Sequence, residues 1–176
     1  MHIRIATSLD QENIYRVHWS AFAEDEREIV SKLAVNLFSE ETTPQTISFV
    51  AETENAIVGH VAFSPVIIGS NKNFQGYILA PLGVKPDYQK RRIGSKLIER
   101  GMQQLSRMGV DILFVYGDPK YYSRFGFSVD AAKCYIPPHR LEYPFGWQSI
   151  ALSECNIIKS SIKIACVTSL CDPTLW

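Results

Sequence analysis

The chain has 176 residues, a length typical of one domain, and 46% of them are hydrophobic, which is ordinary for a globular protein. It carries 18 Lys and Arg residues against 18 Asp and Glu residues, and this balance argues against a domain-wide basic surface for nucleic acid. The N-terminus lacks the apolar core of a signal peptide, and no apolar run reaches membrane-spanning length. We therefore expect a cytoplasmic protein with neither a membrane nor a nucleic-acid partner.

The N-terminal part of the chain predicts one strand and two helices. Residues 2–7 alternate in polarity, as a short strand does. Ser8 and Gln11 have the spacing of a capping box and predict a helix start there. The apolar face expected for this helix is Ile14, Val17, His18, Ala21 and Phe22. A second helix is expected over residues 25–38, with Ile29, Val30, Leu33 and Leu37 on its apolar face.

Three consecutive strands are predicted next. Residues 47–52 and 56–69, joined by a turn at Glu54-Asn55, are typical of an antiparallel hairpin. Residues 76–84 predict a third strand that contains Pro81 and Gly83. Proline within a strand indicates an edge, a bulge or a split in the sheet.

The C-terminal half continues with a helix over residues 93–108, whose apolar face is Ile93, Leu97, Ile98, Met102 and Leu105, and which ends at Gly109. The further elements expected are a buried strand at 111–117, a short helix from Pro119, a strand at 125–130, a loop at 132–147, and closing strands at 149–154 and 161–168. The order predicts a single α/β (α+β) domain over residues 1–176 with a mixed sheet. It is not a Rossmann order, because three strands follow one another without crossover helices.

The four cysteines, Cys134, Cys155, Cys166 and Cys171, form no C-x-x-C pair and have no histidine at metal-ligand spacing. We therefore expect free thiols in a reducing cytoplasm, with an incidental disulfide as the alternative, and no metal site.

The stretch PDYQKRRIGSKLIERG, residues 86–101, gathers five basic residues around Gly94 at the expected helix start: Lys90, Arg91, Arg92, Lys96 and Arg100. The first amides of a helix have no intrahelical partner and lie at the positive end of its dipole, so a basic turn there favours phosphate. A solvated helix face is the competing interpretation. The sequence contains no P-loop, no G-x-G-x-x-G dinucleotide motif and no G-x-S-x-G nucleophile elbow.

A second stretch, GDPKYYSRFGF at residues 117–127, follows about 30 residues later. Together, LAPLGVKPDYQKRRIGSKLIERG and YGDPKYYSRFGF resemble the GNAT superfamily, the GCN5-related N-acetyltransferases. IVGHVAFSPV at residues 57–66 adds to a resemblance with the YhbS-like branch. The resemblance covers residues 3–130 well and the part at 132–176 loosely. It implies acetyl-CoA as the donor and a primary amine as the acceptor.

The resemblance also implies which residues bind the cofactor. The family pattern Gln/Arg-x-x-Gly-x-Gly/Ala, whose amides hold the pyrophosphate of CoA, is matched by Gln89 and Gly94, but Arg92 replaces its middle glycine. A negative φ at Arg92 would keep the amides in place. On the interrupted strand, Leu82 and Val84 are expected to hydrogen-bond the pantetheine arm, and the Leu82 N–H to stabilise the oxyanion. The complete predicted set is Leu82, Gly83, Val84, Gln89, Lys90, Arg91, Arg92, Ile93, Gly94, Ser95 and Asp118.

Tyr122 stands at the position of the family's usual tyrosine. A phenol with a pKa of about 10 can protonate a departing thiolate whose conjugate acid has a pKa of about 8.5. A packing tyrosine beside Phe125 and Phe127 is the alternative. Asp118 stands where relatives often have an asparagine that contacts pantetheine, and is a predicted cofactor contact.

Several features stay open at this stage. Candidates for the general base are Glu24, Glu26, Asp118 and His60, or a backbone carbonyl acting through water. The amine acceptor is expected to be lined by the first two helices and by residues 132–147, which include Tyr135, Tyr143, Phe145 and Trp147. A non-catalytic CoA-binding sensor or assembly module and an acyltransferase for longer chains are the alternative functions. Monomer and homodimer are both left open.

Overall fold

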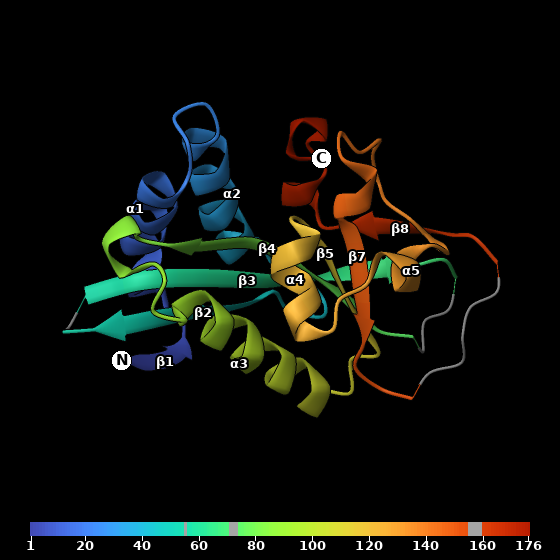
Figure 1. Ribbon diagram of the computed structural model, residues 1–176, viewed down its shortest axis with the longest axis horizontal. Coiled ribbons are helices and arrows are strands. Elements are labelled where there is room, and N and C mark those ends of the chain that lie inside the picture. The colour runs from blue at the N-terminus through green and yellow to red at the C-terminus, as the bar shows by residue number, and fades with distance from the viewer. Residues whose placement is uncertain (55, 71–73, 155–159) are drawn as a thin grey trace. The chain divides into compact units, whose positions relative to one another are not determined.

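The computed structural model describes residues 1–54, 56–70, 74–154 and 160–176 (Figure 1). Its helices are α1 (Gln11–Ala21), α2 (Arg27–Ser39), α3 (Ile93–Arg107), α4 (Pro119–Tyr122) and α5 (Val129–Ala132). Its strands are β1 (His2–Ile5), β2 (Ile47–Thr53), β3 (Ala56–Ile68), β4 (Gly76–Val84), β5 (Ile112–Tyr116), β6 (Tyr135–Ile136), β7 (Trp147–Ala151) and β8 (Ile162–Cys166).

The strands follow the order β1-β2-β3-β4-β5-β7, and β8 pairs with both β3 and β6. The pairs β1–β2, β2–β3, β3–β8 and β5–β7 are antiparallel, whereas β4–β5 and β6–β8 are parallel. The fold is therefore mixed α/β with a mostly antiparallel sheet flanked by helices. This confirms the predicted fold class and the predicted hairpin of β2 and β3, whose turn residue Asn55 lies outside the described residues.

The chain divides into two compact units, each built from two segments. Unit 1 comprises Met1–Phe63 and Ala80–Gly101, and unit 2 comprises Ser64–Leu79 and Met102–Trp176. The strands β3 and β4 and the helix α3 each contribute residues to both units. The extent of a single domain over residues 1–176 stays a prediction.

In unit 1, helices cover both faces of the strands: α1 and α2 lie on one face and α3 on the other (Figure 1). The predicted apolar faces are buried at Ile14, Val17, Leu33, Leu37, Leu97 and Ile98. The predicted capping box of Ser8 and Gln11 is wrong. Thr7 and Asp10 form that box one residue earlier, where the Thr7 N–H donates to Asp10 Oδ2 at 2.7 Å, and a 3₁₀ turn precedes α1. The Asp10 carboxylate also pairs with Arg4, whose Nη1 lies 2.7 Å from Oδ2.

In unit 2, β5 is buried almost throughout and carries an aromatic cluster. Phe114 stacks on Trp147 with ring centroids 5.2 Å apart, and Tyr116 stacks on Trp176 at 6.2 Å. The predicted strand at 125–130 is wrong. Gly126 has φ +92° and α5 begins at Val129, so that only Ser128 pairs, in a single bridge with Ser149.

The third predicted strand, β4, changes its pairing along its length. It pairs with β5 from Gly76 to Leu79 and then continues past Pro81 to Val84. The β5 pairing thus ends where proline removes a backbone donor, as the sequence indicates. The main chain of Leu82–Val84 therefore extends beyond the pairing with β5, while β3 remains the neighbouring strand on the other side.

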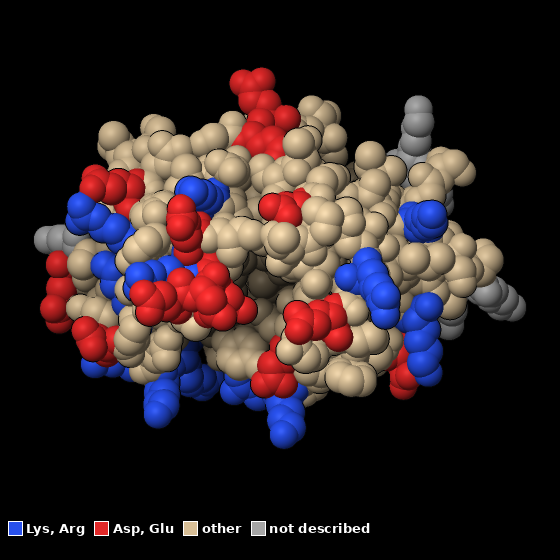
Figure 2. Space-filling view, turned by 90° about the horizontal axis from the view of Figure 1, so that it is seen from above, with Lys and Arg blue, Asp and Glu red and all other residues tan. Residues whose placement is uncertain are grey.

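No helix in the described part of the chain is long and apolar enough to span a membrane. On the face seen in Figure 2, acidic and basic side chains are interspersed rather than gathered into one basic field. This agrees with the equal numbers of acidic and basic residues in the sequence.

Candidate functional site

The basic turn follows β4 within unit 1. A 3₁₀ turn at Pro86–Tyr88 leads to Gln89, whose side-chain Nε2 donates to the carbonyl of Val84 at 3.0 Å. This bond ties the turn back to the end of β4. The Lys96 N–H donates to the carbonyl of Arg92 at 3.0 Å, so the α-helical bonding of α3 starts at Arg92. Helix geometry leaves the amides just after Arg92 without an intrahelical acceptor.

Two basic residues of the turn have a left-handed backbone: Lys90 at φ +59° and Arg92 at φ +62°. The condition of a negative φ at Arg92 is therefore not met. Arg92 adopts the conformation that a glycine favours, so the turn keeps the backbone shape that the family's middle glycine permits. A β-carbon in this region costs about 1–2 kcal/mol. Alternating left- and right-handed residues can turn successive amides toward one concave anion site.

Most of the basic side chains around the turn face solvent, and two of them also contact aromatic rings. Lys90, Arg91 and Arg92 are exposed, and the Arg91 guanidinium lies 5.3 Å from the ring centroid of Tyr88. Farther along α3, Lys96 is exposed, as a solvated helix face would be, whereas Arg100 lies over the ring of Phe49 at 5.7 Å. The cations nearest in sequence to the free helix amides are thus the exposed ones.

Gly83 lies where α1 packs closely against β4. It is buried, and a β-carbon there would lie 2.8 Å from His18 Nδ1 and 2.9 Å from His18 Cε1. Leu82 and Val84 on either side are half-buried. Any side chain at position 83 would displace the His18 ring, so the glycine is required by close packing.

Tyr122 and Asp118 lie together in unit 2, on the short helix α4. The Asp118 side chain caps this helix by accepting from the Lys120 N–H at 2.9 Å. The Tyr122 ring packs on Gly117, where a β-carbon would lie 2.6 Å from Tyr122 Cε2. Sequence reasoning singled out both residues, but it did not assign the capping role to Asp118 or the packing role to Gly117.

The Tyr122 ring is half-buried and meets Phe127 edge-on at 5.8 Å and Tyr121 at 5.1 Å. Phe125, the other ring in the packing alternative, meets Tyr121 at 5.7 Å. Burial, with smaller contributions from Tyr121 and Asp118, raises the pKa of the Tyr122 phenol above its ordinary value. The phenol therefore keeps its proton across the neutral range and can donate it.

The structure distinguishes the four side-chain candidates for a base. Glu24 and Glu26 are exposed, and Glu24 pairs with Arg27 at 3.3 Å. Asp118 is exposed and serves as a cap. His60 is fully buried, and its Nδ1 lies 2.8 Å from Nε2 of His18. Sequence reasoning placed His18 on an apolar helix face and missed this pair, because the partners are 42 residues apart.

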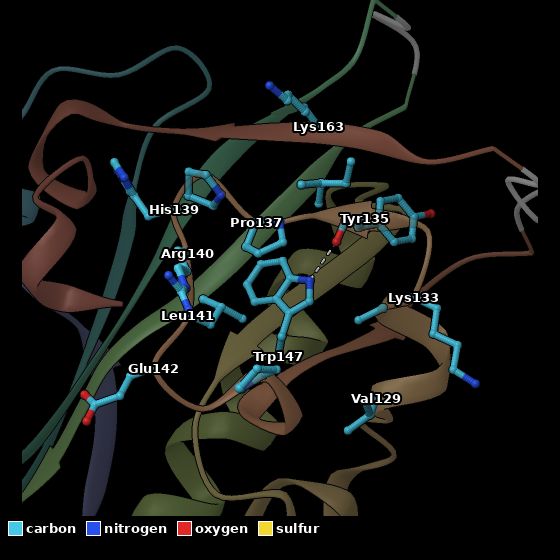
Figure 3. Close-up of a pocket in the computed structure, with 14 residues that line it drawn as sticks. Val129, Lys133, Tyr135, Pro137, His139, Arg140, Leu141, Glu142, Trp147 and Lys163 are labelled. Carbon is cyan, nitrogen blue, oxygen red and sulfur yellow. Dashed lines mark hydrogen bonds between the residues drawn. The ribbon is translucent and has the colours of Figure 1, made fainter.

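Residues 129–147 form most of an open pocket of about 810 Å³ in unit 2, completed by Lys163 of β8 (Figure 3). Trp147 is buried at its centre and its indole N–H donates to the carbonyl of Tyr135 at 2.9 Å. Tyr135 and Trp147 thus belong to the core, whereas Tyr143 and Phe145 are 59% and 67% exposed. The Tyr143 N–H donates to the Tyr116 hydroxyl at 2.9 Å, which ties this loop to the end of β5.

The described residues contain neither a candidate metal site nor a disulfide. These residues contain no cluster of three or more His, Cys, Asp or Glu side chains that could hold a metal ion. Cys134, Cys166 and Cys171 are free thiols, and burial raises the pKa of Cys166 to about 12. Cys155 lies outside the described residues.

Comparison with known proteins finds one family. The model of the acetyltransferase (GNAT) domain matches residues 44–129. The uncharacterized N-acetyltransferase YjhQ of Escherichia coli K12 is 31% identical over 153 residues, which are 85% of this chain and 83% of that protein. The uncharacterized N-acetyltransferase YhbS of the same strain is 32% identical over 133 residues, which are 74% of this chain and 75% of that protein.

Two solved structures are similar over nearly the whole chain. The crystal structure of E. coli YhbS in complex with CoA superposes with a TM-score of 0.77 and 25% identity, covering 93% of this chain and 89% of that one. A GNAT family acetyltransferase from Brucella melitensis in complex with acetyl-CoA gives a TM-score of 0.68 and 29% identity, covering 96% of both chains.

Proposed function

Because the chain belongs to the GNAT family of N-acetyltransferases, we propose that it transfers an acetyl group from acetyl-CoA to a primary amine by direct attack. The observation that carries this proposal is the turn at Gln89–Ser95, where left-handed Lys90 and Arg92 bring exposed cations to the start of α3. Helix amides and cations together suit a pyrophosphate. Both similar structures named above contain CoA or acetyl-CoA.

We assign cofactor binding and each step of acyl transfer to particular residues. The amides of Arg92 to Ser95 and the cations of the turn bind the pyrophosphate, and the main chain of Leu82 and Val84 holds the pantetheine arm. The Leu82 N–H stabilises the oxyanion as the amine nitrogen bonds to the thioester carbon. Tyr122 then gives its phenolic proton to the departing thiolate as the C–S bond breaks. Its raised pKa supports this, because the phenol stays protonated until that step.

We propose that the acceptor binds at the pocket of residues 129–147. Its wall is apolar at Pro137, Leu141 and Trp147 (Figure 3). The exposed rings of Tyr143 and Phe145 lie on the same loop, which is bonded to Tyr116 and Gly117 at the start of the Tyr122 segment. Apolar surface of this kind favours an amine with an apolar or planar side chain. The cytoplasmic location rests on the sequence features alone.

The rival function is a CoA-binding module without catalysis, which the absence of a carboxylate from β4 favours. Screening amines, amino acids and peptides with acetyl-CoA while following free thiol separates the two. Amine-dependent thiol release supports the transferase. CoA binding without release for any acceptor supports the module.

We expect acetyl-CoA to raise the melting temperature. A ligand that binds only the folded state adds about 2.7 kcal/mol at a concentration 100 times its Kd. Arg91→Glu should reduce this shift, because it places a carboxylate beside the pyrophosphate, and Gly94→Glu should abolish it. Arg107→Glu, at the other end of α3, is the control and should keep the shift. An unchanged melting temperature with millimolar acetyl-CoA would remove the basis for the cofactor assignment.

Two substitutions of Arg92 separate the effect of its charge on CoA binding from the effect of its backbone conformation on stability. Both Arg92→Gly and Arg92→Ala remove the guanidinium and should weaken CoA binding to a similar extent. Only glycine relieves the left-handed conformation, which costs other residues about 1–2 kcal/mol. The greater freedom of glycine in the unfolded chain offsets part of this, which leaves about 1 kcal/mol. For a chain of this size that difference should raise the melting temperature of the glycine variant about 2–4 °C above that of the alanine variant. Equal melting temperatures would contradict the positive φ.

A further inference from the structure

His18 of α1 and His60 of β3 form a buried pair inside unit 1. Both are 0% exposed, and His18 Nε2 lies 2.8 Å from His60 Nδ1. The ring planes are nearly perpendicular, at 85°. Among the described residues, neither outer nitrogen, His18 Nδ1 nor His60 Nε2, has a hydrogen-bond partner. In a pair of neutral imidazoles, one outer nitrogen then carries a hydrogen and the other a lone pair.

This arrangement lowers the stability of the folded protein. A buried polar group without a partner costs about 1–3 kcal/mol, and this pair has two of them. Apolar side chains of similar volume would pack there without that cost. Residues that break a folding rule in this way are expected at functional sites, where stability is given up for activity.

The pair lies against the segment that the proposed function uses. The Nδ1–Cε1 edge of His18 touches Gly83, since a β-carbon there would be within 2.9 Å of both atoms. From β3, a β-carbon on Gly59 would lie 3.4 Å from the carbonyl oxygen of Gly83 and 3.1 Å from the side chains of Ile93 and Leu97 on α3. The backbone at Gly83 therefore has α1 against its face and β3 beside it as the neighbouring strand.

We propose that His18, held by its hydrogen bond to His60, is a positioning residue that sets the main chain of Leu82–Val84 for acyl transfer. This rests on the proposed function, in which Leu82 supplies the oxyanion donor. A ring fixed at its inner nitrogen cannot rotate, so its edge fixes Gly83 and, through Gly83, the direction of the Leu82 and Val84 amides. Misplacement of such groups by about 1 Å can cost about a hundredfold in rate.

The test compares His60→Leu with His60→Asn. Leucine removes the hydrogen-bond partner that holds His18, whereas asparagine can place a polar atom where Nδ1 lies. We expect His60→Leu to melt close to the wild-type temperature and to lose about ten- to a hundredfold in kcat, with a much smaller loss of CoA affinity, because the turn that binds the pyrophosphate is unchanged. His60→Asn should recover most of that kcat. A kcat loss that merely follows a fall in melting temperature, or no loss, overturns the proposal. The exposed His2→Leu is the control.

A second readout needs no acceptor. The chain has four histidines, so the ring nitrogens of ¹⁵N-histidine-labelled protein can be followed by NMR as acetyl-CoA is added. We expect the His18 and His60 signals to shift and the His2 signal to stay. If acetyl-CoA raises the melting temperature but leaves His18 and His60 unmoved, the positioning role is wrong while the cofactor assignment stands. If acetyl-CoA does not bind at all, the proposed function fails and the positioning role fails with it.

Discussion

Replacing Tyr122 with phenylalanine is expected to lower kcat by about a hundredfold while leaving the affinity for CoA almost unchanged. The hydroxyl acts only as the thiolate departs, and an interaction made only in the transition state does not appear in ground-state binding. The ring remains against Gly117 and Phe127, so the melting temperature should hold. Burial already raises the pKa of this phenol, so Tyr122 should contribute no loss of activity between pH 6 and 9.

Tyr121→Phe is the matched control, since it removes a hydroxyl from the neighbouring residue of the same short helix. Its effect on kcat should be much smaller. Steady-state thiol release with the best amine gives kcat, and calorimetry gives the CoA affinity. A Tyr122→Phe enzyme with wild-type kcat would exclude the acid role. A lowered melting temperature or weakened CoA binding would show that Tyr122 is structural.

Local patterns in the sequence predicted most of the fold. The apolar periodicity of α1, α2 and α3 and the alternation of β2 and β3 depend on neighbours a few residues apart, and burial follows them closely. The expected strand at 125–130 did not form because a turn residue and a helix cap interrupt the alternation. The alternating residues Phe125, Phe127 and Val129 are compatible with a strand, but Gly126 turns the chain at φ +92° and Ser128 caps α5. Nothing in the spacing distinguishes these two outcomes.

In the candidate site, too, the sequence predicted features within a short motif but not contacts between residues far apart in the chain. Resemblance to a family supplied Tyr122 and the turn at Gln89–Ser95, and their roles stay predictions. The departure at Arg92 was visible in the sequence, but its left-handed backbone was not, because φ depends on how the turn joins β4 to α3. His18 belonged to an apolar face by its spacing. Only the meeting of α1 with β3 shows that it pairs with His60.

The second large effect is a loss of stability in mild acid, which follows from the same pair. Burial lowers the pKa of His18 to about 3, and burial followed by His18 itself lowers that of His60, while Asp10 opposes this weakly. Unfolded histidine titrates near its ordinary pKa of about 6.5. Below that pH the unfolded chain binds protons that the folded chain does not, so the free energy of unfolding falls as pH falls.

At about pH 5, His18 alone should cost about 2 kcal/mol, which lowers the melting temperature by roughly 4–8 °C relative to pH 7. His60 acts in the same direction. Asp10, whose pKa Arg4 lowers to about 2, keeps its charge until well below pH 5 and so adds nothing in this window. Melting curves of the wild type and of a His18→Leu, His60→Leu double variant at pH 7 and pH 5 test this. The melting temperature of the variant should fall much less between pH 7 and pH 5, because its two leucines bind no protons on unfolding. An equal fall in both proteins would mean that the histidine pair is not the acid-sensitive element.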